Sequence, residues 1–352
     1  MAEVVQSELS CPACGGQRHF DPAAGLLSCD SCGATEDLSS PWDGAAQQEH
    51  PVSGNTVPAT ERPAQSADTA DVTHVQCQAC GSQLTFVGLS LSERCGYCDG
   101  PVVRKDPDPT YAPMALIPFA IAQDAARLAQ DQWIASRLFA PRDLPERVAE
   151  GITRALYVPF WTIDAQEATT YWAKKTVRSG KNTRVENISG EQVFTFDDLL
   201  MPASPLVTPL IRDGILHEFE PARLRPYTAG YIAGFAAEQH AQTLADGLAA
   251  NRKDRRLLIR NRIRKKYGWS GVHSITFNTD TSGVHYRRIL LPVWITHYTD
   301  GRGVASKVVT CGIHGRTYGE RPFSRRKVLA ASMAVVMATV LFGLIWGAGA
   351  AL

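Results

Sequence analysis

Eight of the nine cysteines form four C-x-x-C pairs, a spacing that suits metal binding. Each pair places two thiolates on one tight turn, and two such turns supply the four sulfur ligands of a tetrahedral zinc ion. We therefore predict two structural Zn²⁺ ions, one in each of two zinc ribbons. The predicted metal ligands are Cys11, Cys14, Cys29 and Cys32 in the first ribbon, and Cys77, Cys80, Cys95 and Cys98 in the second.

The two sets of cysteines look like copies of one unit. Fourteen residues separate the pairs in each set, and a shift of 66 residues superimposes one set on the other. Gly15 then matches Gly81, and Phe20 matches Phe86. The connection is long enough for a β-hairpin, on which we expect each phenylalanine to cover the metal. Because a unit of about 30 residues cannot build an adequate core, the metal must supply folding free energy.

Other chemistries of these cysteines are less consistent with the pattern. A redox C-x-x-C normally stands alone near a βαβ unit. Catalytic zinc needs an open coordination position, which four thiolates close. An iron–sulfur centre stays an open alternative. His19 and His74 lie near the cysteines, but we expect both on the surface because the thiolates already complete each site.

Charge is distributed unevenly along the chain, although the whole has a formal net charge of +1. Residues 1–100 contain thirteen Asp and Glu, three Arg and no Lys. Nucleic-acid binders use Lys and Arg to displace counterions from phosphates. We therefore expect the ribbons to contact proteins, and nucleic acid is an unlikely partner for them.

The end of the chain predicts a membrane anchor. Residues 328–352 carry no charge, and about 20 apolar residues suffice to cross a bilayer as a helix. Residues 325–327 are Arg-Arg-Lys, and positive residues stay on the cytoplasmic side. Since we also find no N-terminal signal peptide, we expect a single-pass, tail-anchored protein of the cytoplasmic membrane whose N-terminal domains face the reducing cytosol.

The fold class that follows is two small zinc ribbons, an α+β middle domain and one C-terminal transmembrane helix. Residues 38–72 are rich in Ala, Gln, Ser, Thr and Pro and predict a flexible linker, so that the ribbons move independently. The expected boundaries are ribbon one at 1–37, linker at 38–72, ribbon two at 73–105, middle domain at 106–322, and basic flank with anchor at 325–352.

The middle domain mixes strand and helix patterns. Residues 123–138 carry apolar side chains at helical spacing, and a second helical stretch runs from 229 to 267, ended by Gly268. Strands are expected at 116–119, at 155–163, where Pro159 interrupts, and at 289–295. The motifs VPFW and LPVW in the last two strands suggest two related β-rich halves. Segments 167–177 and 303–309, which follow them, resemble hairpins.

The sequence lacks the common catalytic motifs, and we therefore expect a protein that is not an enzyme. The sequence contains no Walker A loop, no G-x-S-x-G and no H-E-x-x-H. We expect Asp197 and Asp198 at the start of a helix, and Cys311 as a small buried side chain despite the nearby His314. The other histidines of the domain are scattered without metal-ligand spacing, namely His217, His240 and His297.

Residues 252–266 hold nine basic residues and one acidic residue. On a helix, Ile259 and Ile263 would form a narrow apolar stripe. A solvated helix face is the simplest interpretation. Binding to anionic lipid, docking on the acidic ribbons and binding to nucleic acid remain alternatives.

Several ordered segments resemble a bacterial group of TFIIB-type zinc-ribbon membrane proteins, which includes YdjG-like members and carries primosomal or helicase-like labels. The resemblance rests on the paired ribbons and on residues 117–141, 157–161, 291–294 and 312–327. Where that family has Asn-Gly, this chain has Cys311-Gly312. The resemblance implies a membrane-anchored adaptor whose partners include phage-shock or flotillin-type proteins of the membrane-stress response.

From these features we expect a cytosol-facing scaffold that recruits proteins to the membrane. The competing expectation is a membrane-tethered nucleic-acid factor that uses the ribbons and residues 252–266.

Overall fold

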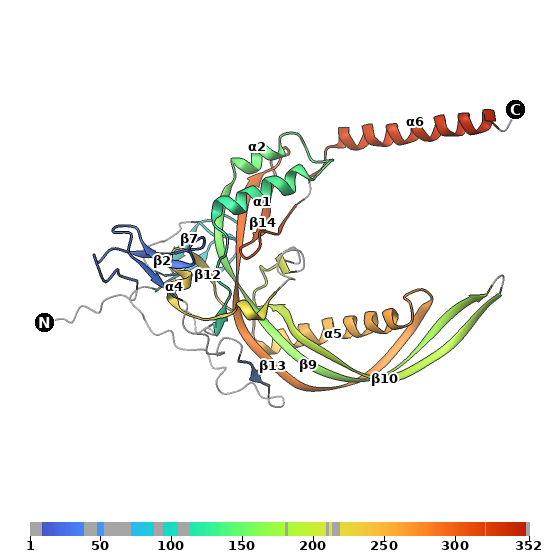
Figure 1. The fold of residues 1–352 in the computed structure, drawn as a ribbon, viewed down its shortest axis with the longest axis horizontal. Helices are drawn as coiled ribbons and strands as arrows, with labels where there is room; N and C mark the ends of the chain where they lie inside the picture. The colour runs from blue at the N-terminus through green and yellow to red at the C-terminus, as the bar shows by residue number, and fades with distance from the viewer. Residues whose placement is uncertain are drawn as a thin grey trace.

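The computed structural model describes residues 9–38, 48–52, 72–87, 94–104, 113–179, 182–208, 211–212, 219–320 and 322–349. Most of the predicted linker, residues 39–47 and 53–71, lies outside the described residues, as does His217. The described chain forms one small sheet, one large sheet, helices beside the large sheet, and a C-terminal helix that extends away from the body (Figure 1).

The first cysteine unit, residues 9–38, has its own antiparallel sheet. Its strands are β1 (Arg18–Asp21), β2 (Leu26–Cys29) and β3 (Thr35–Asp37). The second cysteine unit, described at residues 72–87 and 94–104, contributes β5 (Val72–Cys77), β6 (Gln83–Val87) and β7 (Val102–Arg104). Because β6 pairs with β12 (Ala236–Glu238), these three strands belong to the twelve-stranded large sheet.

Two long antiparallel strands form the centre of the large sheet. They are β9 (Ile152–Ser179) and β13 (Val272–Thr299), each of 28 residues. Around them lie β4 (His50–Pro51), β8 (Ala115–Leu116), β10 (Asn182–Pro202), β11 (Arg225–Pro226), β14 (Ala305–Cys311) and β15 (Thr317–Gly319). Beyond the body of the domain, β9, β10 and β13 continue as a curved arm (Figure 1).

The expected interruption of the strand at Pro159 is wrong, because β9 continues straight through it. On one side, β9 pairs with β12 as far as Tyr157 and with β10 only from Phe160 onward. Pro159 therefore lies in the gap between two neighbours, where its missing N–H costs no ladder hydrogen bond. Pro292 occupies the same kind of gap in β13, between the pairings with β8 and β14.

Pro159 and Pro292 have the same pattern of backbone hydrogen bonds around them. The carbonyl of Pro159 accepts the N–H of Ala203, and that of Pro292 accepts the N–H of Gly312. The carbonyls of Ala203 and Gly312 each accept two further N–H groups, from the segments that precede α5 and α1, respectively. The short strand β12 pairs in parallel with β9, and the short strand β8 pairs in parallel with β13. The two long strands therefore have equivalent neighbours.

The helices differ in part from the prediction. The first predicted helix is confirmed as α1 (Gln123–Ala135), which ends three residues before Leu138. The stretch 229–267 is not one helix. It forms α4 (Ala229–Ile232), strand β12 and then α5 (Leu244–Lys266), and Gly268 follows the end of α5 in a left-handed conformation, with φ of +85°. The shorter elements are α2 (Leu144–Ala149) and the 3₁₀ helix η3 (Pro221–Arg223).

Two local features explain the break within 229–267. Gly234 has φ of +90°, which a helix does not allow, and Ala236–Glu238 find hydrogen-bond partners in the sheet. The helix then restarts with a capping box, in which the Thr243 hydroxyl accepts the N–H of Asp246 and the Asp246 carboxylate accepts the N–H of Thr243.

The predicted hairpins also differ. Segment 167–177 is instead the middle of β9, and it pairs along its length with the antiparallel strand β10. Segment 303–309 does lead into a hairpin strand, because β14 folds back onto β13. An apolar strand pattern shows that a segment is extended but not where its partner begins.

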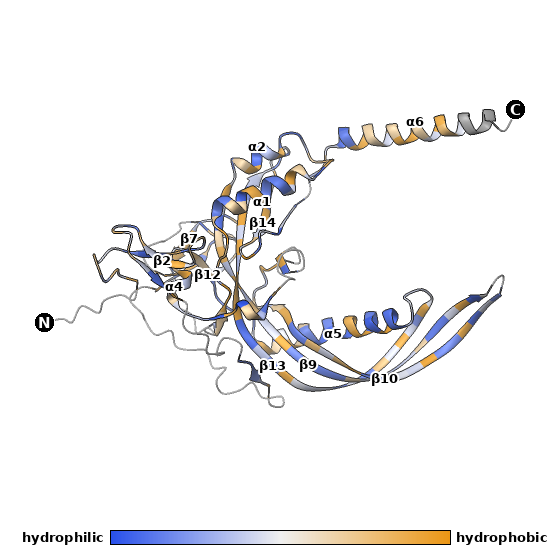
Figure 2. Ribbon diagram, in the orientation of Figure 1, coloured by the Kyte–Doolittle hydropathy of each residue, from blue (hydrophilic) through white to orange (hydrophobic). Residues whose placement is uncertain are grey.

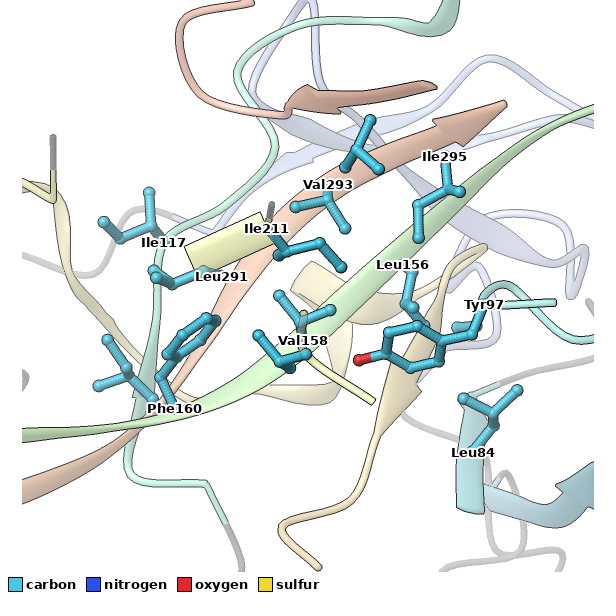
Figure 3. Close-up of a cluster of buried hydrophobic side chains, with 14 of the residues drawn as sticks. Leu84, Tyr97, Ile117, Leu156, Val158, Phe160, Ile211, Leu291, Val293 and Ile295 are labelled. Carbon is cyan, nitrogen blue, oxygen red and sulfur yellow. The ribbon is translucent and has the colours of Figure 1, made fainter. Parts of the chain in front are cut away.

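The main core lies where β9 and β13 cross the body of the domain (Figure 3). Alternate residues of the two strands, including Leu156, Val158 and Val293, pack there. Leu84 and Tyr97 of the second cysteine unit belong to the same buried cluster. The second unit therefore shares the core of the middle domain.

Candidate metal centres

The four cysteines of the first set converge as predicted. Their sulfur atoms all lie within 4.8 Å of one another. Cys11 Sγ lies 3.6 Å from Cys32 Sγ, and Cys14 Sγ lies 3.6 Å from Cys29 Sγ. We call this group the first tetrad.

The second set has the same geometry. Cys77 Sγ lies 3.5 Å from Cys98 Sγ, and Cys80 Sγ lies 3.7 Å from Cys95 Sγ. A tetrahedral zinc ion with Zn–S bonds of 2.3 Å requires sulfur atoms about 3.8 Å apart. Both tetrads could therefore hold a metal ion of this size with little movement of the side chains.

Backbone hydrogen bonds shape each C-x-x-C turn. The N–H of Cys11 donates to the carbonyl of Gly16 at 2.7 Å, and the N–H of Gly15 donates to the carbonyl of Cys11 at 2.8 Å. Gly15 and Gly81 have φ of +71° and +77°, which explains why glycine recurs at this position of the repeat. In the last turn, Asp99 takes that conformation, with φ of +57°.

Hydrogen bonds and burial shift the thiol pKa values in opposite directions. The N–H of Cys32 points at the sulfur of Cys29 and lowers the pKa of Cys29 to about 7. Burial raises the pKa of Cys80 in the second tetrad to about 11. A metal ion must displace the proton of such a thiol, so metal affinity rises with pH.

Buried polar contacts attach the second cysteine unit to the domain. The Tyr97 hydroxyl donates to the carboxylate of Glu238, which also accepts the Ser204 hydroxyl at 2.7 Å. Glu238 is 3% exposed, and burial raises its pKa to about 7. At the rim, Arg154 pairs with Asp99 at 2.8 Å. Sequence reasoning missed Glu238, because nothing in the surrounding AAEQH segment marks it as a buried acid.

The first cysteine unit docks through different contacts. The N–H of Phe20 donates to the carbonyl of Ala233 at 3.0 Å, and the Phe20 ring meets the Tyr231 ring edge-on at 5.4 Å. The Tyr231 hydroxyl donates to the carbonyl of Leu38 at 3.0 Å. The expectation of independently moving ribbons is therefore wrong for the described residues, since both units pack on the middle domain.

The two phenylalanines of the repeat have different surroundings. Phe86 shares a buried cluster with Cys77 and Cys95, near the second tetrad as expected. Phe20 instead belongs to a cluster with Tyr231 that contains no cysteine of the first tetrad. The expectation that Phe20 covers the metal is therefore wrong: this side chain attaches the unit to the domain.

The two histidines near the tetrads also differ. His19 is partly exposed and pairs with Asp30 at 3.0 Å. His74 is half-buried, and its Nδ1 accepts the Gln239 side-chain N–H at 2.6 Å. The surface expectation therefore suits His19 but not His74.

The predicted helix start at Asp197 and Asp198 is wrong. These residues lie at a bulge of β10, where Asp198 has φ of +50° and donates its N–H to Asp164 Oδ1 at 2.7 Å. The carboxylate of Asp198 pairs with the buried Arg287, which also lies 3.3 Å from Glu49. The carboxylate oxygens of Glu49, Asp164 and Asp197 lie within 4.8 Å of one another. Of these three residues, Glu49 lies within ion-pair distance of Arg287.

The remaining candidate residues are dispersed. His240 is buried against Trp161, and burial lowers its pKa to about 3. His297 Nε2 contacts the carbonyl of Gly96 at 2.9 Å, beneath the second tetrad. Cys311 is buried, as expected, at the end of β14.

The C-terminal helix α6 (Arg325–Gly349) extends away from the body of the molecule (Figure 1). Its described segment Arg325–Gly343 is long and apolar enough to cross a membrane, and none of it is buried. Figure 2 shows the change from the hydrophilic first turn to the apolar turns that follow it.

Comparison with known proteins shows a similarity to a curated bacterial protein. The chain is 25% identical over 330 residues to "Uncharacterized protein YdjG" of Bacillus subtilis (strain 168), and the match covers 91% of each chain. No protein-family profile matches the chain. No solved structure matches it either. The likeness to TFIIB-type zinc-ribbon proteins stays a prediction.

Proposed function

We propose that this chain is a zinc-containing, membrane-anchored adaptor that faces the cytosol and recruits proteins to the membrane. The proposal rests on where the cysteine units and helix α6 lie in the molecule. Both cysteine units lie on one side of the body, and the exposed apolar helix α6 leaves from the other (Figure 1). A chain inserted through α6 would present the cysteine units away from the bilayer.

Zinc is the metal that best suits this role. Four thiolates at tetrahedral spacing form a closed site, and a closed site stabilises structure without offering a position to substrate. The small sheet of the first unit buries few side chains of its own, so a bound ion would supply much of its folding free energy.

The residues at the start of α6 indicate which side of the membrane the domains would face. Arg325, Arg326 and Lys327 precede the apolar segment, and positive flanks remain on the cytoplasmic side. The Lys327 ammonium donates to the carbonyl of Ala140 at 2.7 Å, which holds the beginning of the helix against the domain.

A cleft beside the second tetrad offers a surface for a protein partner. Its volume is about 650 Å³, and its walls include Cys98, Ile152 and Lys307. Ile152 is 49% exposed there, and charged groups of both signs surround it. An exposed apolar side chain inside a polar rim is the usual anatomy of a transient protein interface.

Photo-crosslinking in cells tests the proposal. A photoreactive amino acid replaces Ile152 in the cleft, and a second variant carries it at Val193 on the arm, where the side chain is similarly exposed at 59%. The resemblance described above makes phage-shock and flotillin-type proteins the first partners to look for.

We expect discrete membrane-associated protein adducts at Ile152 that are absent at Val193. The adducts should disappear when Cys77 and Cys95 are replaced by serine. Identical adducts at both positions, or adducts that persist without the second tetrad, would contradict the adaptor function.

A second candidate is a nucleic-acid factor, and the exposed basic face of α5 favours it. Seven of its Lys and Arg side chains are exposed, namely Arg252, Lys253, Arg256, Arg260, Arg262, Lys265 and Lys266. Binding of fluorescent DNA and RNA should then weaken in the double variant Lys253→Glu/Arg260→Glu. The matched control is Arg127→Glu/Arg142→Glu, two exposed residues near α1. Equal effects of the two variants would remove this candidate.

A further inference from the structure

The turn between β14 and β15 has the backbone of a metal-binding C-x-x-C turn, although its sequence is C-x-x-H. The N–H of Cys311 donates to the carbonyl of Arg316 at 2.8 Å, and the N–H of Gly315 donates to the carbonyl of Cys311 at 3.1 Å. Gly315 has φ of +74°. The corresponding hydrogen bonds in the second tetrad run from Cys77 to Ser82 and from Gly81 to Cys77, at 2.9 and 3.0 Å.

The side chains also follow the pattern of the tetrads. The N–H of Ile313 points at Cys311 Sγ at 3.4 Å, as the N–H of Tyr97 points at Cys95 Sγ at 3.4 Å. The first ligand position is buried and the second is exposed, both in this turn and in the turns of the first tetrad. His314 thus occupies the position of a second metal-binding cysteine.

The distance between the two side chains fits a shared metal ion. Cys311 Sγ lies 3.5 Å from His314 Nε2. A tetrahedral zinc ion with bonds of about 2.3 Å to sulfur and about 2.05 Å to nitrogen separates such ligands by about 3.6 Å. Cys311 is fully buried, so its sulfur contacts His314 rather than bulk solvent.

We propose that Cys311 and His314 form a third metal-binding turn, which supplies one thiolate and one imidazole to a divalent transition-metal ion such as Zn²⁺. Water completes the coordination. Binding releases the thiol proton of Cys311 and leaves the ring proton of His314 on Nδ1. The contact from the Arg316 N–H to Nδ1, at 3.3 Å, must therefore open when the ion binds.

This site differs from the tetrads in a measurable way. Two protein ligands bind a metal ion more weakly than four, and the water positions leave the ion open to exchange. The third ion should therefore be the first to leave during chelator competition. The inference stands apart from the adaptor function, because it rests on the geometry of this turn alone.

The test uses the full-length protein in detergent, with both tetrads loaded with Zn²⁺ and Co²⁺ added as the spectroscopic probe. Tetrahedral Co²⁺ bound to a thiolate gives a charge-transfer band and visible d–d bands. We expect the wild-type chain to take up one additional equivalent with these bands. Cys311→Ser should abolish the charge-transfer band.

His314→Ala keeps the test decisive if replacement of the buried cysteine disturbs folding, because His314 is exposed. This variant should weaken Co²⁺ binding at least about tenfold, because the loss of an outer-shell partner alone costs about 10–100-fold in metal affinity. The control His273→Ala, another exposed histidine, should bind as the wild type does. Absence of the thiolate band in the wild-type chain, or unchanged binding by His314→Ala, would overturn the proposal.

Discussion

The two cysteine units share their ligand spacing but not their place in the fold. The first keeps a separate three-stranded sheet and touches the domain mainly through Phe20 and Leu38. The second is built into the large sheet, where Leu84 and Tyr97 reach the main core. The C-x-x-C turns shape both units alike, and the residues on their outer faces decide how each unit is attached.

The largest expected effect is the loss of a tetrad. Cys77→Ser with Cys95→Ser should abolish the main thermal unfolding transition or lower it strongly, because strands of the second unit belong to the central sheet and structural zinc contributes about 10–16 kcal/mol of binding free energy. Cys11→Ser with Cys29→Ser should leave the main transition in place. Calorimetry and zinc analysis of both variants check this, and equal losses would remove the distinction between the units.

The next effect comes from the contact that docks the first unit. Phe20→Ala removes a buried ring packed on Tyr231, a change that costs about 3–5 kcal/mol in protein cores. Amide exchange should accelerate in residues 9–38 while both metal ions stay bound. The matched variant Phe86→Ala should instead destabilise the main domain. Slow exchange in the first unit of Phe20→Ala would show that other contacts hold it.

The buried acid beneath the second unit makes stability depend on pH. Burial raises the pKa of Glu238 from 4.5 to about 7. Between these values the unfolded chain releases the proton that the folded chain keeps, so stability falls as pH rises and the loss is complete above about pH 7. The loss from this group is about 3 kcal/mol.

Glu238→Gln removes this dependence, because the amide does not ionise. Denaturant unfolding at pH 5.5 and pH 8 should show a larger decrease for the wild-type chain than for this variant. Among the described residues of the first unit, 9–38, no acidic side chain is buried as Glu238 is. A common pH slope for both proteins would show that Glu238 ionises freely in the folded state.

The smallest effect concerns one ion pair in each unit. Arg154 joins Asp99 of the second unit to β9, whereas Arg18 joins Glu36 within the first unit. Such partly exposed pairs contribute up to about 1 kcal/mol, or about 2–4 °C in a domain of this size. Arg154→Met should lower the main melting temperature by this amount, and Arg18→Met should not change it. The difference should shrink at high salt.

Patterns of neighbouring residues predicted the local features well. The cysteine spacing identified two groups of four cysteines that the structure brings together, and helical spacing identified α1. The sequence could not show that Pro159 lies in a gap between β12 and β10, because a partner more than 70 residues away creates that gap. For the same reason, the helix expected across residues 229–267 was broken by a strand that finds its partner in the second cysteine unit.

The sequence alone determined the two sets of converging cysteines and the apolar C-terminal helix, because both depend on residue types at short, regular spacing. Tertiary structure decided which cysteine unit shares the main core, where Glu238 is buried, and how Cys311 meets His314 in a turn shaped like those of the tetrads. These features depend on hydrogen bonds and packing between distant segments, which no local pattern specifies.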